Sequence, residues 1–193
     1  MPYKPEHRLR TRKKILESAQ YLFSHYGAEK TSIGDIMERA ELTHGGFYNH
    51  FSSKDELLAQ VIHDSVSLSK LANVPQEKEE KEKWLDQVLR SYLSLEHASR
   101  KTFACPLTFL ARDVSLGTFD AKHEYEELLR QHISKIIEHF LDHKSSKEAK
   151  SSSYSVTALM LGALNMASAV NNNNLAEEIL ESARESVKNI LRM

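Results

Sequence analysis

The sequence has few of the residues that interrupt helices or cross-link chains. Its 193 residues include one cysteine, four prolines and six glycines. A single cysteine cannot form an internal disulfide, which is consistent with a reducing compartment, and we expect a cytoplasmic protein. No clear run of alternating apolar and polar residues predicts a half-buried strand. We therefore expect an all-α fold.

Long apolar segments and a large net charge are also missing. No apolar run is long enough to span a bilayer, and the amino end is polar and basic, so we expect no membrane span and no signal peptide. The formal net charge of −1 argues against non-specific nucleic-acid binding by the whole molecule. A glycine-rich phosphate loop, a zinc-binding helix motif and paired catalytic carboxylates are all lacking. We expect no enzymatic activity and no cofactor.

Basic residues are nevertheless concentrated at the amino end. Before residue 20, two acids, Glu6 and Glu17, face a larger group of cations: Lys4, Arg8, Arg10, Arg12, Lys13 and Lys14. Taken alone, such a segment is usually a solvated tail. Beside a DNA-reading motif it is more typical of an arm that follows phosphates.

The most informative stretch is residues 32–51, which begins with a short helix. Apolar residues recur at helical spacing from Ile33 to Ala40 and give this helix one buried face. Ser32 is a suitable N-cap, and Asp35 approximates the second half of a capping box. The sequence therefore predicts where this helix begins.

A second short helix, from His44 to Phe51, follows after three residues, with Thr43 in position to cap it. Phe47 and Phe51 lie four residues apart and would anchor the helix inward. The outward residues would be His44, Tyr48, Asn49 and His50. A polar face on an apolar anchor suits a DNA major groove, so the pair predicts a helix-turn-helix.

Two glycines, Gly45 and Gly46, fall in the first turn of this second helix. Each costs a helix about 1 kcal/mol relative to alanine. A helix without side chains there can bring its backbone and its N-terminal N–H groups against phosphate. The glycines therefore favour close approach to another surface.

At these residues the chain resembles the TetR family of transcriptional regulators. Residues 42–58, LTHGGFYNHFSSKDELL, are similar to the recognition helix of that family and its exit into the next helix. The similarity continues upstream through residues 11–16, Ala19, Phe23, Gly27, Thr31 and Ser32, and so covers about a quarter of the chain. Gly46 departs from the family pattern, which often has a larger residue there.

The resemblance implies a homodimeric repressor that a small-molecule or electrophile effector releases from a palindromic operator of double-stranded DNA. It implies about nine helices, in a DNA-binding domain at residues 1–53 and a ligand-binding and dimerisation domain at residues 54–193. The DNA-contacting residues would be Thr31, Ser32, Thr43, His44, Gly45, Tyr48, Asn49, His50 and Lys54. The alternative is a helical ligand- or protein-binding module without operator-specific DNA binding. The basic arm with Lys54 favours DNA.

Helical spacing continues through the rest of the chain. We expect further helices at residues 9–26, from residue 54, at residues 84–97 and at residues 119–143. Residues 76–83 are expected to be a solvated loop or an exposed first turn, and residues 144–153 a connection that contributes nothing to the core. The last two helices, one at residues 154–170 and one from residue 175, are rich in small and apolar positions. We expect them to form a dimer interface of four helices, with plain core as the alternative.

Candidate effector residues lie in this second part of the chain. The expected pocket residues are Tyr92, Phe103, Cys105, Phe109, Met160, Leu164, Asn165 and Met166. The Asn165 amide needs a partner, which is either a ligand or a backbone carbonyl across the dimer. Cys105 is either a small buried residue or a thiol that senses electrophiles. His139 and His143 lie four residues apart on one helix face, and His132 lies two turns before His139. Because the sequence does not dictate a third ligand for such a pair, we expect no metal site.

Overall fold

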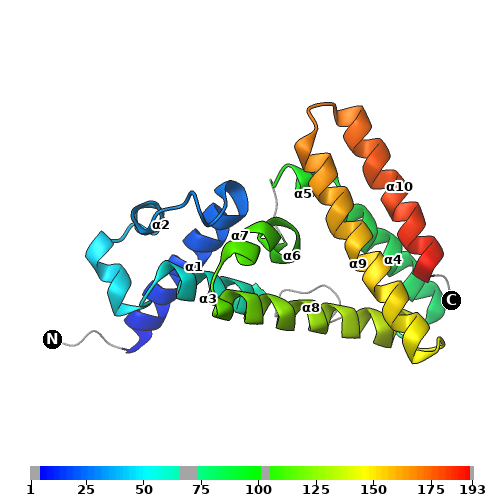
Figure 1. The fold of residues 1–193 in the computed structure, drawn as a ribbon, viewed down its shortest axis with the longest axis horizontal. Coiled ribbons are helices and arrows are strands. Elements are labelled where there is room, and N and C mark those ends of the chain that lie inside the picture. Colours follow the sequence, from blue (N-terminus) through cyan, green and yellow to red (C-terminus); the bar gives the residue numbers. More distant parts are fainter. Residues whose placement is uncertain (1–4, 66–73, 101–104, 192–193) are drawn as a thin grey trace. The chain divides into compact units, whose positions relative to one another are not determined.

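The computed structural model describes residues 5–65, 74–100 and 105–191 (Figure 1). Within these ranges it contains ten α-helices, one 3-10 helix labelled η1, and no strand. The prediction of an all-α fold is confirmed. In the described part of the chain, no helix is long and apolar enough to cross a membrane.

Contacts along the chain group it into two units. The first comprises residues 1–67 and 104–128, and the second comprises residues 68–103 and 129–193. This division differs from the expected boundary at residue 53. The helix that follows the boundary, α3, packs against α1, and residues 105–128 return to the first unit.

The first unit is built around a long amino-terminal helix. Its elements are α1 (Pro5–Tyr26), α2 (Ile33–Arg39), η1 (His44–Asn49), α3 (Lys54–Ser65), α6 (Pro106–Phe109), α7 (Ala111–Leu116) and the first part of α8 (Phe119–Phe140). Gly27 ends α1 at a φ of +86°, where only glycine avoids strain, and its N–H donates to the Phe23 carbonyl at 2.9 Å. Helix α1 begins earlier than the expected residue 9.

Large apolar side chains from these elements and from the residues between them form the core of the first unit. The fully covered ones are Ile15, Phe23, Ile36, Met37, Phe47, Phe51, Leu57, Ile62 and Leu110. Tyr26, the last residue of α1 before the chain turns at Gly27, is 60% exposed.

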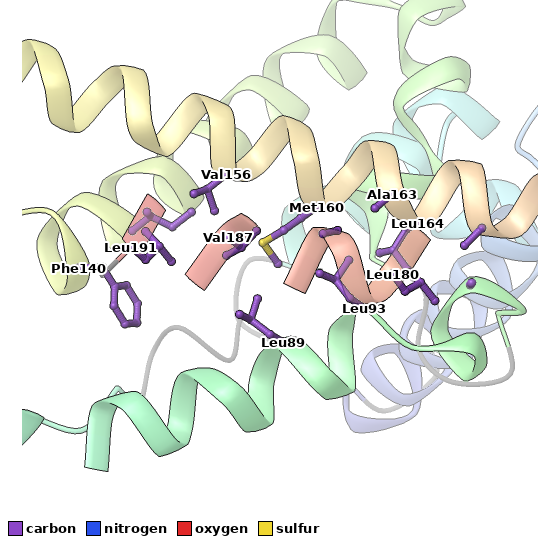
Figure 2. Close-up of a cluster of buried hydrophobic side chains, with 14 of the residues drawn as sticks. Leu89, Leu93, Phe140, Val156, Met160, Ala163, Leu164, Leu180, Val187 and Leu191 are labelled. Carbon is purple, nitrogen blue, oxygen red and sulfur yellow. The ribbon is translucent and has the colours of Figure 1, made fainter. Parts of the chain in front are cut away.

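The second unit contains α4 (Lys78–Tyr92), α5 (Leu95–Ala98), α9 (Ser146–Ala169), α10 (Asn173–Leu191) and the rest of α8. Figure 2 shows its core, in which Met160 and Leu164 of α9 lie among Leu180 and Val187 of α10 and Leu89 of α4. Helices α9 and α10 form the most extensive helix pair of the described chain.

Residues 78–83 form the first turns of α4, in agreement with the exposed first turn that was one of the two expectations for residues 76–83. Residues 144–153 were expected as a connection, but α9 begins at Ser146. Ser145 caps α9 through a complete capping box with Glu148, whose carboxylate accepts the Ser145 hydroxyl at 2.6 Å. Since Ala149 and Ser153 are buried, the expectation that residues 144–153 contribute nothing to the core is wrong.

A buried arginine joins α10 to the end of α4. Arg184 is 6% exposed and donates to the carbonyl of Leu93, the C-cap of α4, and to the carboxylates of Glu177 and Glu181. A cation at a helix C-terminus is favoured by the helix dipole, and the two carboxylates neutralise its charge.

Candidate nucleic-acid interface

The second helix of the helix-turn-helix is a 3-10 helix, not the expected α-helix. Its hydrogen bonds span three residues, with the Gly46 N–H donating to Thr43 at 3.0 Å and the His50 N–H to Phe47 at 2.9 Å. Two consecutive glycines weaken the α-helical alternative in the first turn. Thr43 occupies the N-cap position but its hydroxyl makes no capping hydrogen bond, so that expectation is wrong.

The apolar anchor of η1 lies as predicted. Phe47 is 0% and Phe51 2% exposed, with ring centroids 5.8 Å apart. On the other side, Tyr48 is 60% exposed, and the side chains of His44 and Asn49 are exposed as well. The structure therefore presents a polar and aromatic face on a fixed apolar base.

The two glycines of η1 differ in their surroundings. A Cβ on Gly46 would lie 3.6 Å from the Cε of Met37, in ordinary contact with the core. A Cβ on Gly45 would meet nothing within 4 Å. Packing does not require a glycine at position 45, which leaves room there for the close approach of an external backbone or base.

Cations from the start of α1 lie beside η1. An Arg8 Nη2 donates to the Asn49 carbonyl at 3.3 Å. The Arg12 guanidinium lies 4.5 Å from the centroid of the Phe51 ring and donates to Gln60 of α3 at 3.0 Å. The basic segment and the helix-turn-helix, separate in sequence, thus form one surface.

His50 lies beneath this cationic surface and is not fully outward as expected. It is only partly exposed, and its Nδ1 is buried with no hydrogen-bond partner among the described residues. Burial lowers the pKa of His50 below its usual value of 6.5, and the nearby charges of Arg8, Arg12 and His7 lower the pKa further.

Three other candidate contacts are used inside the protein. The Lys54 ammonium donates to the carbonyls of Ala28 at 2.8 Å and Thr31 at 3.1 Å. Thr31 is 3% exposed and its hydroxyl donates to the Gly27 carbonyl, so its side chain does not face solvent as a DNA contact would require. The Ser32 hydroxyl is exposed but donates to Asp35 at 2.7 Å.

The first unit also uses a residue that the sequence did not indicate. Asp113 of α7 accepts the backbone N–H groups of Ala28 and Glu29 at 2.7 and 3.1 Å. Ala28 and Glu29 precede Asp113 in the chain by 85 and 84 residues. No local pattern relates them, so sequence reasoning had no signal to detect.

The candidate effector residues do not form one pocket within either unit. Cys105, which precedes the four-residue α6, and the buried Phe109 belong to the first unit, whereas Tyr92 and all the α9 candidates belong to the second. Met160 and Leu164 lie in the core. Phe103 lies outside the described residues.

The remaining α9 candidates face solvent. Met166 is 58% exposed, and the exposed Asn165 donates its amide to the Leu161 carbonyl of the same helix at 3.0 Å. Their role in an effector pocket stays a prediction, because an apolar stretch of sequence does not show which side of a helix a ligand or a second copy covers.

Two further features of the described residues concern ligands. An open cleft of about 380 Å³ in the second unit contains none of the candidates and is lined by Lys81, Glu82, Leu85, Asp86, Phe140, Lys188 and Leu191. No group of three His, Cys, Asp or Glu residues in the described ranges has the geometry to hold a metal ion.

Comparisons with known proteins concern mainly the amino-terminal part. The family model described as "Bacterial regulatory proteins, tetR family" matches residues 15–61. The A-factor receptor protein of Streptomyces griseus is 41% identical over 56 residues, which are 29% of this chain and 20% of that protein. The probable acrEF/envCD operon repressor of Escherichia coli K12 is 35% identical over 63 residues, which are 33% of this chain and 29% of that protein. The chain thus matches less than a third of the length of these curated relatives.

The fold as a whole is similar to that of solved regulators. The reduced form of NemR from Escherichia coli superposes with a TM-score of 0.77 at 20% identity, covering 94% of this chain and 98% of that one. A TetR regulator from Legionella pneumophila superposes with a TM-score of 0.75 at 18% identity, covering 99% of both chains. Residues 15–61 thus match the tetR family of bacterial regulatory proteins, and the chain as a whole has the fold of these solved proteins.

Proposed function

We propose that the protein is a homodimeric transcriptional repressor that binds a palindromic operator and leaves it when a small-molecule effector binds. The observation that carries the proposal is the surface of η1, where exposed His44, Tyr48 and Asn49 stand on the buried Phe47 and Phe51 beside the α1 cations. The relatives support it, since they are named as regulators, one as a repressor and one as a receptor.

Direct base contacts are proposed for the start of η1. His44 offers ring nitrogens, Thr43 is exposed, and the open space at Gly45 allows the backbone to approach a base edge. Tyr48 and Asn49 complete the exposed face, as base or sugar-phosphate contacts.

Phosphate contacts are proposed for the cations beside η1. Arg8, Arg12 and His50 lie together, and their charge supplies affinity without sequence preference. Ser32 remains a candidate through its exposed hydroxyl. Lys54 has three N–H donors, and its two bonds to carbonyls leave one for phosphate.

Dimerisation is proposed for the exposed faces of α9 and α10. Opposite its core side, α9 carries small or apolar exposed residues that include Tyr154, Ala158 and Ala169, and a Cβ on Gly162 would meet nothing within 4 Å. Such a surface allows two helix pairs to approach closely as a four-helix bundle around a two-fold axis. Two recognition helices would then read the halves of a palindrome.

In this proposal the effector acts in the cytoplasm by one of two routes. It is either a small molecule held by the helices that follow the helix-turn-helix, or an electrophile that modifies the partly exposed Cys105. The Cys105→Ser variant separates these routes. For an electrophile effector, the variant binds operator but keeps it after treatment with a thiol-reactive electrophile; unchanged release excludes Cys105 as the sensor.

The test is selection of bound sequences from randomised duplex DNA at two salt concentrations. The wild-type protein is expected to enrich a palindrome. His44→Ala is expected to relax the preference at one position of each half-site by about 1–3 kcal/mol, whereas His143→Ala, an exposed histidine of the second unit, should leave the motif unchanged. No enrichment, with binding that disappears at moderate salt, would favour the module without operator-specific DNA binding.

A further inference from the structure

A segment from the carboxyl-terminal side of the chain completes the DNA-binding unit. Residues 105–128, here called the strap, comprise α6, α7 and the first part of α8, and they belong to the same unit as α1 to α3. The strap contributes Leu107, Phe109 and Val114 to buried positions. It is therefore packed in place and not a loose connection.

The strap reaches the connection between α1 and α2 through one carboxylate. Gly27 adopts a left-handed conformation, and the N–H groups of Ala28 and Glu29 that follow both donate to the Oδ1 of Asp113. Successive N–H groups beside a left-handed residue form a concave site that favours anions. A Cβ on Gly27 would lie 3.4 Å from the same oxygen, so α7 lies close to the glycine backbone.

Helix dipoles do not explain this placement. Asp113 lies at the C-terminal end of α1, where a negative charge is unfavourable. The two charge-assisted hydrogen bonds must offset that cost, since hydrogen bonds to ionised groups are about twice as strong as neutral ones. The carboxylate is thus held by the amides of this connection.

The same connection is held from its carbonyl side by α3. Lys54 donates to the carbonyls of Ala28 and Thr31, while Asp113 accepts the N–H groups of Ala28 and Glu29. Ser32, the N-cap of α2, follows directly. The conformation of residues 27–31 therefore determines where the first helix of the helix-turn-helix begins.

Two further contacts hold the strap. The hydroxyl of the half-buried Tyr125 donates to the Leu107 carbonyl at 2.7 Å, which ties α8 to α6, and burial raises the pKa of Tyr125 to about 12. The Nδ1 of His63 in α3 lies 3.0 Å from the Oε2 of Glu124 in α8. Asp113 differs from both because its partners belong to the connection that leads into α2.

We propose that Asp113 is a positioning residue for DNA binding, which holds residues 27–31 and thereby α2 and η1 in the arrangement that meets the operator. The effect of Asp113 on operator binding rests on the proposed function. Its role in holding residues 27–31 does not. Residues 1–67 alone then lack one contact of the DNA-binding unit, and any event that lifts α7 away from Gly27 weakens operator binding.

The structural part is tested by hydrogen exchange of the full-length protein without DNA. Asp113→Ala is expected to speed exchange of the Ala28 and Glu29 amides roughly tenfold or more, and to speed exchange across α2. Asp113→Asn keeps an acceptor oxygen without the charge and should give a smaller increase. Asp120→Ala changes an exposed aspartate of the same strap and serves as the control.

The outcomes separate this inference from the proposed function. Unchanged exchange at residues 28 and 29 in Asp113→Ala overturns the inference, and so does an equal increase in every helix, which would mean a general loss of stability. With an operator in hand, Asp113→Ala should lower its affinity by roughly the factor by which exchange rises, since both report the same displaced state. Unchanged operator affinity with faster exchange would refute the positioning role. A wild-type protein that selects no operator contradicts the proposed function and leaves the exchange result to decide.

Discussion

Lys54 stabilises the fold and is also a proposed phosphate contact. Two of its donors bind the carbonyls of Ala28 and Thr31, which close the connection between α1 and α2. Lys54→Met keeps the aliphatic stem and removes the ammonium, leaving two partly buried carbonyls without that donor. We expect the free energy of unfolding, measured by urea titration, to fall by about 2 kcal/mol.

Lys30→Met, at an exposed position of the same connection, is the matched control and should change stability by less than about 0.5 kcal/mol. If Lys54→Met leaves stability unchanged but weakens binding to all DNA sequences alike and lowers the salt slope by about one, its role is a phosphate contact alone.

His50 should make the proposed DNA binding depend on pH. Burial, followed by the charges of Arg8, Arg12 and His7, lowers its pKa below 6.5 in the free protein. A phosphate beside the ring would offset those positive charges and raise the pKa again, so DNA binding should take up a proton. We expect operator affinity to increase as pH falls from about 8 to 6, in the range around the ordinary histidine pKa. Titrations of operator binding at several pH values and fixed ionic strength measure this change in affinity.

The pH dependence of stability has the opposite sign. Because the folded-state pKa of His50 is below the unfolded value, its contribution to stability is complete above about pH 6.5 and is lost as pH falls through the folded-state pKa. His50→Gln should make both dependences shallower, and His143→Gln should not. Equal slopes for operator affinity in wild type and His50→Gln would show that other groups carry the proton.

Residues with local partners were predictable from sequence, and those with distant partners were not. Ser32 and Asp35 were expected to form a capping box because both partners lie within one helical turn, and the structure contains it. Phe47 and Phe51 were correctly placed inward by their spacing. The carbonyls bound by Lys54 belong to residues 23 and 26 positions away, a relation that only the folded chain defines.

At the scale of elements, amino-acid composition gave a wrong expectation for residues 144–153, whereas the capping residues indicate the helix correctly. Residues 144–153 are rich in serine and lysine, which favours a connection, yet a Ser145 to Glu148 capping box was present in the sequence and begins α9. Conversely, η1 has helical spacing but contains two glycines, and it forms a 3-10 helix. Local backbone chemistry determined both elements more than apolar content did.

The Ser145 cap gives a direct test at this scale. Ser145→Ala removes the oxygen that accepts the Glu148 N–H, and we expect the free energy of unfolding to fall by about 1 kcal/mol. Ser146→Ala, one residue into the helix, should change it by less than about 0.5 kcal/mol. Urea denaturation followed by circular dichroism measures both. Equal effects of the two substitutions would mean that the cap does not stabilise α9.

At the scale of the whole molecule, the proposed dimer requires that one side of α9 meets a second copy. Sequence alone could not separate core from interface, because small and apolar residues occur on both sides of this helix. In the structure, Ala163 and Ala167 are buried against the core, while Ala158 and Ala169 are exposed. Only the exposed side is available to a partner.

Ala158→Glu tests that assignment. A carboxylate on each of two facing α9 helices would bring like charges together in a desolvated interface, so we expect a monomer at micromolar concentration by sedimentation equilibrium. Operator affinity should fall by at least about tenfold, because the two heads no longer bind as one unit. Ala111→Glu makes the same change at an exposed position of α7 and should remain dimeric. A dimeric Ala158→Glu with unchanged operator affinity would place the interface on another surface, since an exposed position tolerates glutamate without loss of the fold.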